Sequence, residues 1–236
     1  MIEFKKVFIQ YVNEFYSLYD FSYEINSHTL FVGDFFSGTT AIMRTLSKID
    51  KDYKGDIFID DINLKNIKDK DLNLSYLPET PVLFKNKNIF DNLYFPLKIR
   101  KINKNNAKNL IFSIFFELKN NNFEIFNECL DIKNYDLNNE NILKNEDHRD
   151  YLIESILKLK VKKLSLSEQK ILSLIRAILR KPKFVLIENF FENLNEKHIQ
   201  LAEFLLNKIK ETSTIIACEK EVKHLFKNFQ INNLTK

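Results

Sequence analysis

The sequence is poor in the residues that mark disulfide-rich, metal-binding and exported proteins. Its two cysteines, Cys129 and Cys218, lie far apart and form no C-x-x-C pair, which favours a reduced, cytoplasmic location. The four histidines show no metal-ligand spacing, so no metal site is expected from them. The N-terminal segment lacks a signal-peptide core, and the most apolar run, Leu110–Leu118, is too short to span a bilayer and contains a glutamate. We therefore expect a cytoplasmic protein that reaches the inner face of a membrane only through a partner.

The sequence also lacks a strong excess of either positive or negative charge. The chain has 36 basic and 32 acidic residues, a net charge of +4, with no basic stripe interleaved with aromatic residues. Nucleic acid is therefore not an expected partner. With 236 residues and 44% hydrophobic content, the chain can bury a full core, as one large domain or as one domain with an inserted lobe.

Glycine is scarce too, because only three occur, and two of them share one segment. In Thr29–Ile42, TLFVGDFFSGTTAI, a β-branched and aromatic run enters Gly33, and Gly38 and two threonines precede apolar residues at helical spacing. This order has the length and hydroxyl placement of a phosphate-binding loop, G-x-x-x-x-G-K-[ST], with Thr39 in place of the lysine. Simple turn glycines followed by a threonine helix cap are the alternative, and they share the same local structure.

The remaining pattern predicts an α/β fold. Strands are expected at 2–11, 19–25, 29–32, 56–59, 74–77, 184–187 and 212–217, with helices from Gly38 to about Ile49 and from Glu196 to Lys210. The alternation of strand and helix favours a parallel sheet of the P-loop NTPase type, preceded by an antiparallel β lobe. Between 85 and 163, amphipathic helical pieces alternate with polar joints such as Asn134–Asp147 and predict an inserted helical lobe. We expect one domain over 1–236, with 1–84 and 164–236 as core and β lobe and 85–163 as helical lobe.

A second informative stretch, Val161–Asn195, follows the predicted helical lobe. Ser165 and Glu168 have the spacing of a capping box, and an apolar helical stripe from Ile171 to Ile178 follows them. The apolar run Phe184–Ile187 is typical of a central parallel strand, and it ends in an acid and an amide, Glu188 and Asn189.

In this order, the motifs resemble the nucleotide-binding domain of an ABC transporter over essentially the whole chain. Tyr11 stands where that family stacks an aromatic ring on adenine, and VGDFFSGTTA resembles its phosphate loop. YLPETPVLF and NIFDNLYFPLKIR resemble the segment that leads into the helical lobe. KLSLSEQKILSLIRAILRKPKFVLIENF resembles the signature motif, its helix and the acidic strand end, while ENLN and IIACEK resemble the dimer-contact loop and the switch strand.

The phosphate loop departs from the family pattern in ways that weaken nucleotide binding. Thr39 replaces the lysine that contacts the β- and γ-phosphates, so a cation is lost beside an anionic ligand. Phe36 replaces a loop glycine, and its side chain impedes close approach of the backbone to phosphate. Thr40 keeps the hydroxyl that the family uses for magnesium, and the amides around Ser37 and Gly38 can still bind an anion.

The strand ends depart from the pattern as well. Glu79 replaces the glutamine near the γ-phosphate, and Glu188 replaces the magnesium-facing aspartate with a longer carboxylate. Asn189 replaces the glutamate that polarises the attacking water, and an amide is not basic. Glu219 stands in place of the switch histidine, and an ionised carboxylate cannot donate a hydrogen bond to phosphate.

The signature segment keeps only part of its pattern. Ser165, Glu168 and Gln169 are retained, but Leu166 and Ser167 replace the two glycines that bring amides close to the partner subunit's nucleotide. Asn195 likewise replaces the aspartate of the dimer loop. Both composite sites of a dimer are therefore expected to be weakened.

Several of these positions also have a plain structural interpretation. Tyr11 can be a strand aromatic in the core, and Glu188 a surface acid at a strand end. Glu79 can be a loop residue after Pro78, and Glu219 a solvated acid beyond its strand. Positions that build the fold match the family, whereas positions that carry chemistry do not.

The sequence therefore predicts a catalytically inactive ABC-type ATP-binding subunit with no catalytic residue, in which ATP and magnesium are held weakly or lost. It would act as a structural or regulatory partner in a membrane-associated complex. The helical lobe, with the segment Pro81–Leu97, would receive a permease-like membrane protein, and the domain would pair with itself or with an active homologue. The run Asn88–Arg100 resembles the subclass that serves lipid-transport and cell-division complexes.

Two alternatives stay open. One is a slow ATPase in which Thr40 and Glu188 hold magnesium and another acid replaces the missing base. The other is nucleotide-gated binding without hydrolysis, in which Tyr11 and the loop amides hold ATP. The transported cargo, its direction of transport and the identity of the membrane partner stay open in each case.

Overall fold

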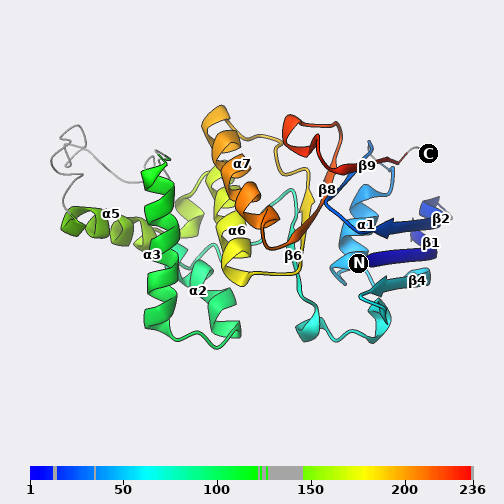
Figure 1. Cartoon of the computed structure of the whole chain (residues 1–236), viewed down its shortest axis with the longest axis horizontal. Coiled ribbons are helices and arrows are strands. Elements are labelled where there is room, and N and C mark those ends of the chain that lie inside the picture. The colour runs from blue at the N-terminus through cyan, green and yellow to red at the C-terminus, as the bar shows by residue number, and fades with distance from the viewer. Residues whose placement is uncertain (13–14, 35, 122, 124–125, 127–145, 235–236) are drawn as a thin grey trace. The chain divides into compact units, whose positions relative to one another are not determined.

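The computed structural model describes residues 1–12, 15–34, 36–121, 123, 126 and 146–234, and at 11–12, 15–16 and 146–150 it describes the backbone alone. Cys129 and most of the predicted joint Asn134–Asp147 lie outside these residues. The chain forms two compact units, the first comprising 1–79, 181–192 and 206–236 and the second 80–180 and 193–205. Most helices and strands of both are labelled in Figure 1.

The first unit contains an antiparallel sheet in the order β2-β1-β4-β5. Its strands are β1 (Ile2–Val12), β2 (Phe15–Ile25), β4 (Lys54–Ile59) and β5 (Ile62–Asn63). Alternate residues of β1, such as Ile2 and Phe4, are buried because successive side chains of a strand point to opposite faces. The predicted antiparallel lobe is confirmed, and its second strand begins at Phe15 rather than at Tyr19.

The same unit contains a fully parallel sheet in the order β6-β7-β8-β3-β9. Its strands are β3 (Thr29–Val32), β6 (Leu74–Leu77), β7 (Phe184–Glu188), β8 (Thr214–Glu219) and β9 (Gln230–Asn233). Every residue of the central strand β7 is buried, which explains its continuous apolar run. The predicted parallel core is therefore confirmed, and all five strands end at the same edge.

Helix α1 (Thr39–Leu46) packs into the core of the first unit. Its buried residues Ile42 and Met43 belong to one apolar cluster with Phe4 of β1, Phe31 of β3 and Leu186 of β7. Figure 1 shows α1 beside the antiparallel strands, in agreement with this cluster. The packing fixes the start of α1 at the carboxyl end of β3.

The predicted end of this helix, at Ile49, is wrong, because α1 ends at Leu46. Lys48 has a φ of 58°, in the left-handed region, and the amide of Ile49 donates a hydrogen bond to the carbonyl of Arg44. This closure turns the chain away from the helix axis. Ile49 is consequently 51% exposed instead of buried.

The second unit is helical. It contains α2 (Ile89–Ile99), α3 (Lys104–Asn120), α5 (Glu146–Lys158), α6 (Leu166–Arg180) and the first part of α7 (Glu196–Lys210). Two asparagines cap its helices, since the side chains of Asn88 and Asn103 accept hydrogen bonds from the amides of Asp91 and Asn106. Polar joints in the sequence thus mark helix starts.

Short 3-10 helices lie at Leu64–Asn66, Asp69–Asp71, Val161–Lys163 and His224–Phe226. Within the described ranges, no helix has both the length and the apolar character needed to cross a bilayer.

Candidate functional site

A cavity of about 260 Å³ opens at the carboxyl edge of the parallel sheet, within the first unit. Residues that follow neighbouring parallel strands meet at such an edge, which is where open α/β sheets bind ligands. The lining includes Gly33 after β3, Glu79 beyond β6, Asn189 after β7 and Lys220 after β8. The fold thus brings together three residues that the sequence proposed separately, and adds Lys220.

The loop between β3 and α1 requires its two glycines. A Cβ atom on Gly33 would lie 2.3 Å from the Ser37 hydroxyl oxygen. Gly38 has a φ of +95°, and a Cβ there would lie 2.3 Å from the carbonyl oxygen of Ser17. The loop therefore needs glycine at both positions, with the strand–loop–helix order that the sequence predicts.

The start of α1 offers hydrogen-bond donors to the cavity. Gly38 is the N-cap residue and has no side chain with which to cap the first-turn amides. Thr39 and Thr40 follow it and line the cavity, and the Ser37 hydroxyl lies 3.4 Å from that of Thr39. Amides and hydroxyls at a helix N-terminus fit an anion such as a phosphate group.

Phe36 occupies a backbone conformation that glycine favours. Its φ of 69° lies in the left-handed region, and its side chain is 80% exposed at the rim of the cavity. The position therefore carries the conformation of a glycine with a bulky side chain added to it.

The acid at the end of β7 is engaged within the sheet. Glu188 is 7% exposed and accepts a hydrogen bond from the hydroxyl of Tyr76 on β6, so it is not a surface acid. Burial, together with the adjacent carboxylate of Glu188, raises the pKa of Tyr76 and keeps this phenol protonated. Glu188 is not among the described residues that line the cavity, whereas Thr40 is.

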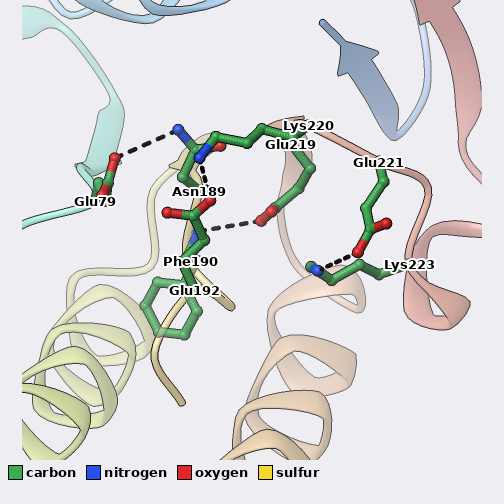
Figure 2. Close-up of polar contacts among 8 residues, drawn as sticks. All are labelled: Glu79, Asn189, Phe190, Glu192, Glu219, Lys220, Glu221 and Lys223. Carbon is green, nitrogen blue, oxygen red and sulfur yellow. Dashed lines mark hydrogen bonds and ion pairs between the residues drawn. The ribbon is translucent and has the colours of Figure 1, made fainter. Parts of the chain in front are cut away.

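Asn189 and Glu79 both line the cavity and contact one another. The Asn189 side-chain nitrogen donates to Glu79 Oε2 at 3.4 Å, and the Asn189 backbone amide donates to the carbonyl of Cys218 at 2.9 Å. Asn189 has a φ of 42°, a left-handed conformation that asparagine tolerates well. Glu79 therefore places a carboxylate within hydrogen-bond reach of Asn189, the position after the β7 acid (Figure 2).

The side chain of Glu219 is buried and accepts a hydrogen bond from a backbone amide. Glu219 is 2% exposed, so the interpretation as a solvated acid is wrong. Its Oε1 accepts a hydrogen bond from the amide of Phe190 at 3.1 Å, and its carbonyl accepts from the amide of Gly33 at 3.2 Å. This residue holds the loops after β7 and β3 against the end of β8.

Sequence reasoning missed several residues that line the cavity, namely Ser17, Asp34, Ala41 and Lys220, and of these Lys220 is the basic one. Its side-chain nitrogen lies 2.5 Å from Glu192 Oε1, and this hydrogen bond raises the pKa of Lys220. Lys220 follows Glu219 directly after the end of β8, at the sheet edge where the cavity opens. Its place just beyond a predicted strand is the signal in the sequence that could have identified it.

The predicted capping box stands at the start of α6, in the second unit. The Ser165 amide donates to Glu168 Oε2 at 2.7 Å, and the Glu168 amide donates to the Ser165 hydroxyl at 3.3 Å. This prediction is confirmed, and the two side chains satisfy amides that the helix leaves unpaired.

The other signature positions use their side chains within the second unit. The Ser167 hydroxyl donates to the carbonyl of Asn193 at 3.0 Å, and the Gln169 amide group donates to the carbonyl of Leu164 at 2.9 Å. Leu166 is 44% exposed. This segment presents apolar and hydroxyl side chains where family members present bare backbone.

Two further predicted positions complete the set. Tyr11 lies in β1, and its side chain lies outside the described residues. Asn195 Oδ1 accepts from the amide of His198 at 2.9 Å and so caps the start of α7. In the described parts of the chain, no three His, Cys, Asp or Glu side chains are grouped to hold a metal ion.

The family profile described as "ABC transporter" matches residues 18–191, which is more than half of the chain. The chain belongs to the ABC transporter family. The resemblance of its ordered motifs to an ABC nucleotide-binding domain is thereby confirmed. The matched range contains both the loop with Gly33 and Gly38 and the β7 strand end with Glu188 and Asn189.

Relatives and solved structures agree with this assignment. The chain is 25% identical over 190 residues to the molybdate/tungstate import ATP-binding protein WtpC of Thermococcus kodakarensis, covering 80% of this chain and 47% of that protein. It thus spans about half the length of the curated relatives it matches.

The fold agrees with two solved structures. The dimeric, post-hydrolysis ATP-binding cassette MJ0796 bound to ADP and phosphate superposes with a TM-score of 0.68 at 17% identity, over 94% of this chain and 88% of that one. A bacterial Atm1-family ABC exporter with ATP bound gives a TM-score of 0.70 at 17% identity, over 99% of this chain and 36% of that one. The ABC ATPase fold predicted from the sequence is therefore confirmed.

Proposed function

We propose that the chain is a catalytically inactive ATP-binding subunit of an ABC transporter complex, with a structural or regulatory role. The observation that carries this proposal is the β7 strand end. Asn189 stands where active members of the family carry the glutamate that polarises water. Its side-chain amide donates a hydrogen bond to Glu79. An amide cannot accept the proton of an attacking water, so the hydrolytic step lacks its base.

Nucleotide binding rests on the groups around the phosphate loop. The first-turn amides of α1 and the hydroxyl of Thr40 would hold the phosphate groups of ATP, since both border the cavity. Bound magnesium would neutralise part of the phosphate charge, and Thr40 supplies a hydroxyl oxygen for it. We expect weak binding, because Thr39 replaces the loop lysine and Asp34 and Glu79 also line the cavity.

The positions of Glu188 and Glu219 agree with inactivity. Tyr76 holds the Glu188 carboxylate, and the Phe190 amide holds that of Glu219. A carboxylate in the place of the switch histidine has no proton to donate to a phosphate oxygen. Both acids therefore stabilise the sheet edge in this subunit.

The described structure also favours a specific form of the alternative, a slow ATPase. Glu79 lines the cavity and lies 3.4 Å from the Asn189 amide, so this acid would stand beside the position of the missing base and could accept a proton from water. In that case phosphate release would be measurable and Glu79→Gln would abolish it.

The membrane partner is proposed from the second unit. Val82, Phe84 and Phe95 are 70%, 46% and 45% exposed, and the rings of Phe84 and Phe95 meet edge to face at 5.0 Å. An exposed apolar surface of this kind fits a helix of a permease-like protein. The complex would place the chain at the cytoplasmic face of a membrane, paired with itself or with an active homologue.

Two comparisons bear on the transported cargo and its direction. WtpC is named for molybdate and tungstate import, whereas the Atm1-family protein is an exporter. The run Asn88–Arg100, most of which forms α2, favours a complex of the lipid-transport or cell-division type.

The deciding experiment combines calorimetry with a phosphate-release assay on the full chain. We expect Mg-ATP to bind without phosphate release, and Thr39→Lys to tighten binding about tenfold or more by adding a charge-assisted contact. Thr40→Ala should weaken binding. Sustained phosphate release that Thr40→Ala abolishes would refute the inactive assignment.

A further inference from the structure

Lys220 is the one cationic side chain among the described residues that line the cavity. It stands at the end of β8, where Glu219 pairs with Val32 of β3 in the parallel register. The residues that follow these two, Lys220 and Gly33, therefore lie at the same edge of the sheet. The lysine thus reaches the cavity that the phosphate loop borders.

A polyphosphate in this cavity would need such a cation. Thr39 occupies the lysine position of the loop, while Asp34 and Glu79 add two negative charges to the lining. Without Lys220 the charged side chains of the described lining would all be acids, and their repulsion would oppose the attraction of the first-turn amides for an anion.

The present partner of Lys220 is easily replaced. Its ion pair with Glu192 joins side chains that are 36% and 29% exposed, and ion pairs as accessible as this contribute little to stability. Figure 2 shows the lysine extending from the end of β8 past Asn189 to reach Glu192. A lysine side chain has the length and flexibility to swing a short distance to another acceptor.

We propose that Lys220 is the phosphate-binding cation of this site and exchanges Glu192 for a phosphate group of the bound nucleotide. The inference rests on the proposed nucleotide binding. It gives the cavity a cation from the end of β8 in place of the one that the loop has lost, and it makes Glu192 a competitor of the nucleotide.

The first test is calorimetry of Mg-ATP with the native full chain, Lys220→Gln and a matched control, Lys223→Gln. Lys223 lies three residues on and pairs with Glu221 at 3.1 Å, away from the cavity lining. We expect Lys220→Gln to weaken binding about tenfold to a hundredfold, the range of a charge-assisted hydrogen bond. Lys223→Gln should leave the affinity unchanged.

A second variant is expected to increase the affinity for Mg-ATP, a result that misfolding cannot produce. Glu192→Gln removes the competing carboxylate, so Mg-ATP should bind up to about fivefold more tightly, in line with the small free energy of an exposed ion pair. In a Lys220→Gln background the same substitution should have no effect. Adenosine, which lacks phosphate, should bind the native chain and the Lys220→Gln variant with equal affinity.

The outcomes separate the two proposals. If the native chain binds Mg-ATP and Lys220→Gln binds it equally well, the role of Lys220 is refuted and nucleotide binding stands. If no variant, Glu192→Gln included, binds Mg-ATP at millimolar concentration, nucleotide binding and the role of Lys220 both fail.

Discussion

Replacing Asn189 with aspartate tests the arrangement of the β7 strand end most directly. The two side chains have the same shape, and both tolerate the left-handed φ of 42° found here. The substitution therefore changes a donor into an acceptor and adds one charge. In the folded protein that charge would face Glu79 Oε2, to which the Asn189 amide now donates at 3.4 Å.

The expected cost has two parts. Losing the hydrogen bond costs about 1 kcal/mol, and two carboxylates roughly 4 Å apart repel by about 1 kcal/mol in a water-like dielectric and by more where solvent is excluded. Lys220, which lines the same cavity, offsets part of the new charge. We therefore expect Asn189→Asp to lower the free energy of unfolding by about 1–2 kcal/mol.

Urea unfolding at low and at 1 M salt measures this cost. The loss should shrink by roughly half at high salt, because the Debye length there is only about 3 Å. Adding Glu79→Gln should recover most of the stability. Asn193→Asp is the matched control, since Asn193 is also left-handed, with a φ of 62°, and is exposed.

The reasoning is refuted if Asn189→Asp is as stable as the native chain at both salt concentrations. It is also refuted if the loss is the same with and without Glu79→Gln. A confirmed repulsion would show that an acid at position 189 lies close enough to the Glu79 carboxylate to interact with it.

Three further predictions concern stability. Phe36→Gly should raise the free energy of unfolding by about 0.5 kcal/mol in urea titrations, because relief of its left-handed strain exceeds the added freedom of the unfolded chain; a loss would contradict this account. Ser165→Ala should lower the free energy of unfolding by about 1 kcal/mol by removing the cap of α6, and an unchanged urea midpoint would show that the cap is dispensable. Burial raises the pKa of Tyr53 to about 12 and also raises that of Tyr76. Both ionise near pH 10 in the unfolded chain, so stability should hold up to about pH 10 and fall as the pH rises further, less steeply in Tyr53→Phe; equal slopes would contradict the assignment.

Local patterns predicted the framework of this protein well. The glycine spacing at Gly33 and Gly38, the apolar run Phe184–Ile187 and the capping box at Ser165 each depend on residues close in sequence, where backbone sterics and hydrogen bonding decide the outcome. The end of α1 was mispredicted, because an apolar residue at helical spacing, Ile49, does not reveal a left-handed turn at the lysine before it.

The site was predictable in part. Its residue types, and their departures from the family pattern, could be read from the sequence because the motifs follow a fixed order. What each side chain does could not be predicted. The pairing of Asn189 with Glu79 and of Glu188 with Tyr76 joins residues more than a hundred positions apart.

The sequence by itself determined the order of most strands and helices, though not β5 or β9, the need for glycine in the phosphate loop, and the absence of a lysine at Thr39 and of a glutamate at Asn189, because these depend on residue identity and local geometry. Only the tertiary structure decided that Glu219 is buried against a backbone amide while Lys220 enters the cavity. The reason is that parallel pairing of β8 with β3 and β7 brings the end of β8 to the sheet edge where Gly33 and Asn189 also lie.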